Sequence, residues 1–351
     1  MKAGLLGDTH WGCRNDLALF YDHFEKFYND MFDTLKAEGV TDLFQLGDLF
    51  DRRKYINFRT LAESKRIFFD RLAEYDITLH VLVGNHDIHM RESIEINSPS
   101  LMLKEYSNVI VYDKPATVYL DGISVDIIPW ICRDNEKEIV NFINQSKSDV
   151  CLGHFEITGF AMYRGMESHE GLSPDMFLKY ACVFSGHYHT KSAKDNIVYV
   201  GTPYEMSWQD YNDPKGFHIF DTEHMDSLYK FVRNNNTIFE RIEYDDTKPL
   251  PDLNSLNLIN KFVKVVVTNK SDLYKFDNYI SRVYNSGAYE VKVIEDVSEF
   301  SEGDIGEEID LEDTMDVLSN YIDSIETTAD KEKIKNFMKT LYIEAINQEV
   351  E

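Results

Sequence analysis

The chain lacks the cysteine spacings that mark disulfide frameworks and zinc ribbons. Its 351 residues include only four cysteines, and no two of them form a C-x-x-C pair. This absence favours a reducing cytoplasm. No apolar run approaches the ~20 residues that a bilayer-spanning helix needs, so no membrane association is expected. The phosphate-binding loop G-x-x-x-x-G-K-[ST] is also missing, so any dependence on ATP would have to come from a partner.

Basic residues are scarce as well. The sequence has 36 lysines and arginines against 62 aspartates and glutamates, which gives a net charge of −26. A surface of this sign repels polyanions, which argues against a nucleic-acid partner. The acidic excess is uneven, however. Residues 295–351 contribute −14, from 18 acidic residues and four lysines, and the remaining residues contribute −12. Net charge therefore does not exclude DNA.

What the sequence does contain is an alternation of short apolar strands and amphipathic helices. Apolar residues make up 43% of the chain, enough for a sizeable core. Strands are predicted at 2–7, 43–46 and 77–83, with helices between them at 17–38 and 57–75. This order is typical of an α/β sheet with parallel strands. Later strands are predicted at 109–112, 117–120, 123–128, 150–153, 182–185, 197–200 and 217–220, and later helices at 99–106, 135–145 and 174–179.

The pattern changes near residue 221. A hairpin is predicted over 228–243, turning at an Asn-Asn-Asn run, and a small β-α-β unit follows over 262–294. Residues 295–313 hold ten acidic residues and no lysine or arginine, which indicates a solvated linker. Apolar residues at helical spacing then return over 314–351, where two helices are predicted.

Five short motifs place polar residues directly after a glycine that ends a predicted strand. They are Gly7-Asp8-Thr9-His10, Gly47-Asp48-Leu49-Phe50-Asp51, Gly84-Asn85-His86-Asp87, Gly153-His154 and Gly186-His187-Tyr188-His189. Ligands of an open α/β sheet bind outside the carboxyl ends of its strands, so these five ends are candidates for one shared site. A single Asp-x-His is common by chance, and a lone buried histidine is usually a core residue. Five such motifs in order make that explanation weak.

The side chains in these motifs are those of a metal site. Seven of them offer oxygen or imidazole nitrogen, and none is a cysteine, which suits Mn²⁺, Mg²⁺, Fe²⁺ or Zn²⁺. Seven ligands exceed what one ion uses, and a carboxylate can bridge two ions ~3.5–4 Å apart. His86 is then left to act on a phosphate or on a leaving oxygen. The candidate ligands are Asp8, His10, Asp48, Asn85, His154, His187 and His189.

In this order the motifs GDTH, GDLFD, GNHD, GHFE and GHYH resemble those of the calcineurin-like metallophosphoesterases. The stretches ITLHVLVGNHDIH, VIVYDKPATVYLDG and GTPYEMSW look like the SbcD-type (meiotic recombination) nucleases within that family, and most like their T-even bacteriophage branch. The resemblance implies a two-sheet α/β/β/α sandwich over 1–221. It also implies a small α+β capping domain that orients DNA over 222–294, the linker over 295–313, and a helical appendage over 314–351.

The resemblance also implies a role for each site residue. His86 would stabilise the phosphate or protonate the leaving group, and the carboxylate of Asp51 would orient that histidine. The cofactors would be two divalent ions, Mn²⁺ or alternatively Mg²⁺. Asp48 would bridge them, the first ion would be bound by Asp8, His10 and His189, and the second by Asn85, His154 and His187.

The implied activity is that of a DNA exonuclease and endonuclease subunit in a recombination and end-processing complex, in the host cytoplasm if the chain is viral. Its partner would be an SbcC-type ABC ATPase, whose coiled coil the appendage would grip; the alternative is that the two terminal helices pack on their own domain. A homodimer within a heterotetramer is also implied, through the helix at 57–75 and the segment 98–106 with Leu101 and Met102. The basic run at 52–54 is either a contact to DNA phosphates or a solvated loop. Basic residues of 222–294 are dispersed, so no DNA contact is predicted there.

Two other functions remain open at this point. The first is a stand-alone metallophosphatase that acts on phosphoproteins or small phosphoesters, because GDTH and GDLFD also occur in such enzymes. The second is a scaffold with a decayed site that only regulates an ATPase. The complete set of candidate ligands argues against decay, and the motif GNHD, rather than GNHE, argues against a protein phosphatase.

Overall fold

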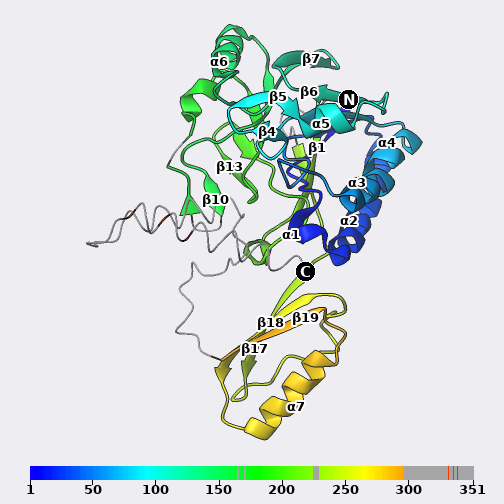
Figure 1. The fold of residues 1–351 in the computed structure, drawn as a ribbon, viewed down its shortest axis with the longest axis vertical. Coiled ribbons are helices and arrows are strands. Elements are labelled where there is room, and N and C mark those ends of the chain that lie inside the picture. Colours follow the sequence, from blue (N-terminus) through cyan, green and yellow to red (C-terminus); the bar gives the residue numbers. More distant parts are fainter. Residues whose placement is uncertain are drawn as a thin grey trace. The chain divides into compact units, whose positions relative to one another are not determined.

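The computed structural model describes residues 1–163, 166–169, 171–223 and 229–295, together with three helical residues, Lys331, Lys335 and Met338 (Figure 1). The chain divides into two compact units, Met1–Val297 and Ser298–Glu351. The predicted linker, except Glu295, and the predicted terminal helices, except these three residues, lie outside the described part of the chain.

The first sheet of the first unit has six strands in the order β16-β15-β1-β2-β3-β6. Its parallel part is formed by β1 (Lys2–Leu6), β2 (Asp42–Gln45), β3 (Thr78–Leu82) and β6 (Val109–Tyr112). Two antiparallel strands extend it, β15 (Gly216–Asp221) and β16 (Tyr229–Arg233). The predicted parallel order therefore holds for the centre of the sheet but not for this edge.

The second sheet also has six strands, in the order β13-β14-β12-β9-β8-β7. The parallel strands are β8 (Ile123–Ile128), β9 (Val150–His154), β12 (Cys182–Gly186) and β14 (Ile197–Tyr199). Antiparallel strands β7 (Ala116–Leu120) and β13 (Ser192–Lys194) close its two edges.

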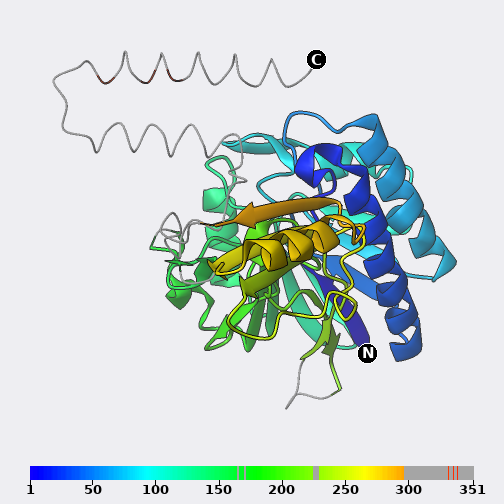
Figure 2. The same cartoon turned by 90° about the horizontal axis from the view of Figure 1, so that it is seen from below.

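Apolar side chains bury both faces of each sheet. Between the sheets, Leu5, Phe44 and Leu82 of the first pack with Ile127, Leu152 and Phe184 of the second. Helix α2 (Ala18–Glu38) covers the other face of the first sheet. Figures 1 and 2 show it beside α3 (Phe58–Ser64) and α4 (Asp70–Glu74). Helix α6 (Glu136–Gln145) covers the other face of the second. Strands buried on both faces have continuous apolar runs, as these do. The predicted α/β/β/α sandwich is confirmed.

The helix predicted over 57–75 is interrupted. It consists of α3 (Phe58–Ser64), a π-helical turn (Lys65–Phe69) and α4 (Asp70–Glu74). The π turn buries three consecutive side chains, Ile67, Phe68 and Phe69, which one face of a regular α-helix does not do. The next helix, α5 (Ser98–Met102), is shorter than predicted and follows an unpredicted hairpin of β4 (Ile88–Met90) and β5 (Ser93–Asn97).

The hairpin predicted over 228–243 is wrong. Strand β16 pairs with β15, whereas β17 (Phe239–Asp245) pairs with β18 (Phe262–Asn269) in another sheet. The Asn-Asn-Asn run does not reverse the direction of the chain, because backbone groups at both ends of this stretch are hydrogen-bonded to other parts of the protein. The Asn234 amide donates to the Lys215 carbonyl, and the Ile238 amide donates to Glu205. The stretch 234–238 is thus a connector between two sheets.

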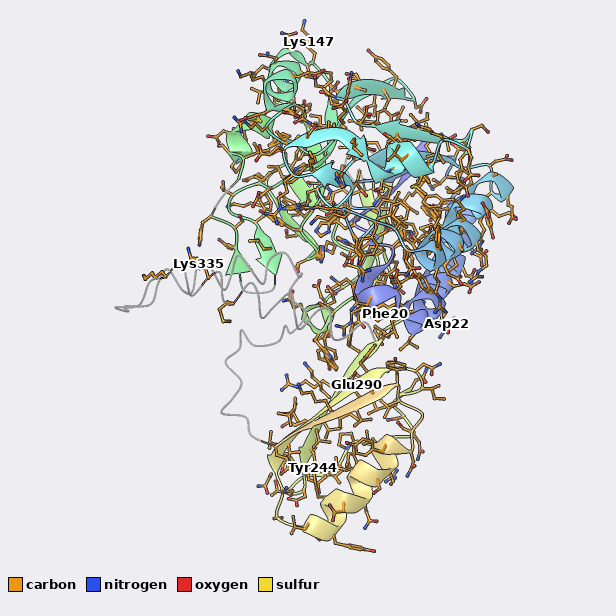
Figure 3. All side chains as sticks on the ribbon, in the orientation of Figure 1. Phe20, Asp22, Lys147, Tyr244, Glu290 and Lys335 are labelled. Carbon is orange, nitrogen blue, oxygen red and sulfur yellow. The ribbon has the colours of Figure 1, made fainter. Side chains whose placement is uncertain are left out.

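The connector leads into a small three-stranded parallel sheet, β17-β18-β19, in which β19 spans Glu290–Ile294. Helix α7 (Leu273–Tyr284) packs on one face and gives it a separate core. Tyr244, labelled in Figure 3, is completely buried there and contacts the rings of Phe276 and Tyr279. The β-α-β unit predicted over 262–294 is therefore present, with β17 as an additional strand.

The packing between the two large sheets can be tested at Phe184, which has no exposed surface and contacts the rings of Phe220 and Tyr229. We expect Phe184→Ala to lower the free energy of unfolding by about 3–5 kcal/mol, because it leaves a cavity between the sheets. Tyr119→Ala, at a strand position that is 74% exposed, is the control and should change it by less than about 0.5 kcal/mol. Equal losses in urea unfolding would contradict this packing.

Candidate metal centre

The five motifs lie at the carboxyl ends of five strands. Those after β1, β2 and β3 come from neighbouring strands of the first sheet, and those at the ends of β9 and β12 come from neighbouring strands of the second. The packing of the two sheets brings both sets of loops together. All seven predicted ligands and His86 lie at this junction, within two groups and their immediate contacts.

The first group consists of Asp8, His10 and His189, whose ligand atoms all lie within 4.8 Å of one another. The Nε2 atoms of the two histidines are 3.1 Å apart, and Asp8 Oδ2 is 3.8 Å from His189 Nε2. Two imidazole nitrogens and a carboxylate oxygen directed at a common point are suited to a divalent ion.

The second group consists of Asp48, His154 and His187. Asp48 Oδ2 is 3.2 Å from His154 Nε2. Asn85 also belongs here, because its Oδ1 lies 2.9 Å from His154 Nε2 and 3.0 Å from His187 Nδ1. The indole of Trp130 packs beside the two histidines, with ring centroids 5.8 and 5.1 Å away.

One carboxylate connects the two groups. Oδ2 of Asp48 lies 3.2 Å from His154 Nε2 in the second group and 3.9 Å from His10 Nε2 in the first. The other oxygen, Oδ1, accepts a hydrogen bond from the His86 amide at 2.7 Å. Asp48 Oδ2 thus lies near an imidazole Nε2 atom of each group, which is the position that a bridging carboxylate would need.

The loops that carry the ligands have unusual backbone conformations. His10, Asp48 and His187 have φ values of 42°, 52° and 88°, in the left-handed region that non-glycine residues seldom occupy. Hydrogen bonds hold them there: the amides of Thr9 and His10 donate to the Asp48 carbonyl, and the His187 amide donates to the Asp8 carboxylate. Such conformations cost energy and concentrate at functional sites.

Two of the motif glycines allow the loops to approach closely. A Cβ atom on Gly84 would lie 2.2 Å from the Asp48 amide nitrogen. A Cβ atom on Gly186 would lie 2.4 Å from the Leu46 carbonyl oxygen and 2.6 Å from Asp8 Oδ1. Any side chain at these positions would push strand ends apart, so the glycines are a geometric requirement of the site.

Asp51 contacts His86 through its main chain: His86 Nδ1 donates to the backbone carbonyl of Asp51 at 2.7 Å. The Asp51 carboxylate lies 3.3 Å from His10 Nδ1, on the side of that ring opposite to His189, and it forms a group of possible ligand atoms with His10 and His86. A carboxylate behind a ligand histidine fixes its orientation and tautomer. The Asp51 main chain thus contacts His86, and its carboxylate lies beside the His10 ring.

Asp87 was not predicted to contribute, yet it organises two motifs. Its buried carboxylate accepts hydrogen bonds from the amides of Gly84, Leu49 and Phe50. It thereby ties the loop after β3 to the loop after β2. The sequence signal that could have indicated this role is the position of Asp87 at the end of the GNHD motif.

Burial and mutual charge strongly shift the titration of the cluster. Burial alone would lower the pKa of His10 and of His154, but the surrounding carboxylates raise each to about 9. Burial raises the pKa of Asp8 to about 6, although His154 opposes this. Burial also lowers the pKa of His189 to about 3, and the neighbouring His10 adds to that effect. Without metal, the cluster thus holds protons on His10 and His154 at neutral pH.

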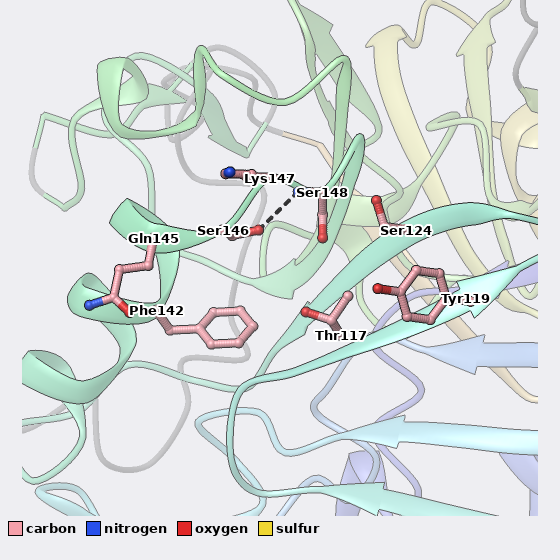
Figure 4. Close-up of a pocket in the computed structure, with 8 residues that line it drawn as sticks. All are labelled: Thr117, Tyr119, Ser124, Phe142, Gln145, Ser146, Lys147 and Ser148. Atoms are coloured by element: carbon pink, nitrogen blue, oxygen red, sulfur yellow. Dashed lines mark hydrogen bonds between the residues drawn. The ribbon is translucent and has the colours of Figure 1, made fainter.

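A separate cavity of about 460 Å³ lies beside β7, β8 and the end of α6 (Figure 4). It is lined by Thr117, Tyr119, Ser124, Phe142, Gln145, Ser146, Lys147 and Ser148. None of these side chains is a carboxylate or an imidazole, and none belongs to the predicted site.

A family model, calcineurin-like phosphoesterase, matches residues 1–191. The chain belongs to the calcineurin-like phosphoesterase family. It is also 37% identical over 348 residues to exonuclease subunit 1 of Enterobacteria phage T4, a match that covers 98% of this chain and 99% of that protein. The family predicted from the motifs is thus confirmed, and the two ligand groups offer the oxygen and nitrogen donors that such metal-dependent enzymes require.

Solved structures give weaker likenesses. GAP50, the anchor in the inner membrane complex of Plasmodium, is 14% identical with a TM-score of 0.38, covering 62% of this chain and 80% of that one. A glutamine-dependent NAD⁺ synthetase from Acinetobacter baumannii is 11% identical with a TM-score of 0.28, covering 99% and 72%. Similarity at this level says nothing about function. Among the described residues, no helix is long and apolar enough to cross a membrane.

The raised pKa values of His10 and His154 lead to a prediction about metal binding. Ligand imidazoles must be neutral, so Mn²⁺ must displace the protons that these histidines hold below pH 9. We expect Mn²⁺ binding at pH 7 to release about two protons, and the affinity to rise between pH 7 and pH 9. Calorimetry in buffers of different ionisation enthalpy measures both quantities.

The control is His80→Gln, because His80 bonds to Tyr112 and Asp42 outside both groups. This variant should release the same number of protons as the wild type. Binding that is independent of pH over this range would contradict the proposed charge state.

Proposed function

We propose that this protein is a metal-dependent DNA nuclease that hydrolyses phosphodiester bonds with two divalent ions, as one subunit of a DNA end-processing and recombination complex. The observation that carries the proposal is the arrangement of two ligand groups around one shared carboxylate, Asp48. It occurs in a chain that matches exonuclease subunit 1 of phage T4 over almost its whole length.

Asp8, His10 and His189 would hold the first ion, and Asn85, His154 and His187 the second, with Asp48 between them. When bound, the two ions would supply an activated water and neutralise charge on the phosphate. We propose Mn²⁺ as the native ion, with Mg²⁺ as the alternative, because the ligands combine imidazole with carboxylate and amide oxygen.

His86 is the residue that would act on the substrate directly. Its Nδ1 must donate to the Asp51 carbonyl, because a carbonyl oxygen can only accept. Nε2 is then the nitrogen that meets a phosphate oxygen or protonates the leaving oxygen. Its ring lies 4.8 Å from that of His10, next to the first ligand group.

This assignment can be tested by replacing His86. We expect His86→Asn to lower DNA cleavage ~10²–10⁴-fold, the usual contribution of general acid–base catalysis, while two Mn²⁺ ions still bind. Asp48→Asn should instead weaken metal binding as well as cleavage. His89→Asn, at an exposed position nearby, is the control and should behave as wild type.

Loss of one ion in His86→Asn would contradict the assignment. It would show that His86 is a ligand, through the third cluster of possible metal-binding atoms, which His86 forms with His10 and Asp51.

A row of cations on the small sheet supports DNA as the substrate. The strand register places Arg241 beside Lys264 and Lys264 beside Lys292. All three lie on the face opposite α7, since Ile242, Val265 and Val293 face the helix. Lys264 also lies over the ring of Trp208 at 4.2 Å. Glu243 and Glu290 occupy the adjacent rows of the same face.

Like charges side by side on adjacent strands repel one another, and Glu243 and Glu290 in the adjacent rows offset part of that repulsion. A phosphate backbone can contact such a row of cations, and an aromatic ring beside them adds a surface for stacking. These residues are far apart in sequence, which is why the sequence did not predict the row. We therefore propose that this face contacts DNA.

The salt dependence of DNA binding tests the cation row. We expect Arg241→Ala with Lys292→Ala to lower the slope of log K against log salt by about 2, because each lost phosphate contact removes about one. Lys248→Ala is the control, since Lys248 is 68% exposed and pairs with Asp245. An unchanged slope would exclude the row as a contact surface.

The rival function is a stand-alone phosphatase. Side-by-side assays with Mn²⁺ on bis-p-nitrophenyl phosphate, p-nitrophenyl phosphate and double-stranded DNA separate the two. A nuclease hydrolyses the diester and DNA, whereas a phosphomonoesterase prefers the monoester. Hydrolysis of the monoester alone would overturn the proposal.

Other contacts are proposed on surface features. Exposed apolar side chains gather on α3, α5 and the nearby hairpin, with Phe58 90% and Leu101 57% exposed, and we propose this surface for a homodimer. Arg52, in the basic run at 52–54, is held by Asn15 and by Tyr55, so any contact it makes to DNA would begin from an ordered position.

The ATPase partner is proposed from the sequence after residue 295. Two stretches carry apolar residues at helical spacing, which suits binding in a groove or to a coiled coil. They follow an acidic stretch that can serve as a tether. The apolar positions are Leu318, Tyr321, Ile322, Ile325, Ile334, Phe337, Met338, Leu341, Tyr342 and Ile346.

Truncation after Asp296 tests this partner. It should preserve metal-dependent cleavage of short single-stranded DNA but abolish co-purification with an SbcC-type ATPase and ATP-stimulated cleavage of duplex DNA. Phe337→Glu with Leu341→Glu should have the same effect, because two charges would be desolvated in an apolar interface. Lys331→Glu with Lys335→Glu is the control for added acidity. A truncated chain that binds the ATPase with full affinity would contradict the proposal.

A further inference from the structure

A buried lysine lies directly behind the first ligand group. The side chain of Lys215 is 4% exposed and comes from the loop before β15. Burying an ammonium group is costly unless all of its donors are satisfied. Here Nζ has three acceptors: Asp210 Oδ1 at 2.6 Å, Asp213 Oδ2 at 2.9 Å and the backbone carbonyl of His189 at 2.9 Å. Its three N–H groups are therefore fully used.

The His189 carbonyl is held at several points. Besides Lys215, it accepts from the Thr202 amide at 3.1 Å and the Thr202 hydroxyl at 3.5 Å. Among these donors only the lysine carries a charge, and a charged donor makes the stronger bond. The main chain of His189 is thus fixed on the side away from its ring, whose Nε2 faces His10.

Lys215 is itself fixed from two directions. Asp210 is held by the amides of Met206 and Ser207 at 2.9 Å each, so one anchor of the ammonium group is rigid. The carbonyl of Lys215 accepts from the Asn234 amide at 2.8 Å, at the start of the connector to the small sheet. The position of Lys215 Nζ is therefore fixed both by its carboxylate partner and by the main chain of Lys215.

We propose that Lys215 is a positioning residue that sets the main chain of His189 and thereby completes the first ion site. The inference rests on the proposed two-ion function, in which His189 binds the first ion. Outer contacts of this kind typically change metal affinity or activity 10–100-fold when removed. In the second group, Asn85 and His154 come from other loops, and the amide of His187, which shares the loop of His189, is held separately by the Asp8 carboxylate. The affinity of the second group should therefore be retained without Lys215.

The experiment is a titration of the full chain with Mn²⁺, followed by calorimetry and by the electron paramagnetic resonance signal of a coupled ion pair. Wild type should bind two ions and show the coupled signal. Lys215→Met should bind one ion with wild-type affinity and the other 10–100-fold more weakly, with the coupled signal appearing only at correspondingly higher Mn²⁺. Lys2→Met is the control, because Lys2 pairs with Glu38 at the opposite end of β1.

Lys215→Met leaves Asp210 and Asp213 without their cation, so a second variant guards against misfolding. Lys215→Arg keeps a positive charge between Asp210 and Asp213, but its planar fork does not reproduce a single point donor to the His189 carbonyl. It should fold and show the same selective loss. Wild-type binding of both ions in either folded variant would overturn the role of Lys215. Failure of the wild type to bind two ions would overturn the proposed function instead.

Discussion

The arrangement of the site depends on the position of Asp48, a buried carboxylate held between two sets of imidazoles. Its carbonyl receives the amides of the loop after β1, and its Oδ1 receives the amide of His86 from the loop after β3. Its Oδ2 faces His154, which comes from the second sheet. A single residue at the end of a central strand therefore connects loops from three other strands. The left-handed backbone conformation of Asp48 makes these contacts possible. Gly84 leaves room for them, because it has no side chain to meet the Asp48 amide.

Charge balance gives this arrangement its chemical character. Asp8 and Asp48 are 1% and 2% exposed, and two carboxylates this buried need compensating positive charge. In the metal-free protein the raised pKa of His10 and of His154 supplies it as protons. Divalent ions would replace those protons with a larger charge at the same place. The negative charge of these two carboxylates makes the cluster costly to bury. The same charge favours the binding of cations.

The sequence predicted which residues gather at the site better than it predicted how their side chains are directed. The motif glycines and the polar residues that follow them identified all seven candidate ligands, because the end of a strand and the chemistry of a side chain are both local properties. The direction of the Asp51 carboxylate was not local: it depends on where the rings of His10 and His86 lie. The cation row of Arg241, Lys264 and Lys292 required the register of three strands.

The errors in the fold have the same origin. The Asn-Asn-Asn run was interpreted as a hairpin turn, but hydrogen bonds to Lys215 and Glu205, distant in sequence, lead the chain into a second sheet. The helix after Asn57 is interrupted because the core buries the three consecutive side chains of Ile67–Phe69, and this burial depends on the tertiary structure. Lys215 itself gave no signal, because a lysine in a polar loop is ordinarily exposed and only the tertiary structure shows three acceptors around it.

The central claim is that two ions share Asp48. Anomalous diffraction from crystals grown with Mn²⁺ tests it most directly, because it locates each ion without reference to activity. We expect two peaks, one among Asp8, His10 and His189 and the other among Asn85, His154 and His187, with Asp48 in contact with both. A single peak, or a second ion held by His86 and Asp51 in place of either group, would contradict it.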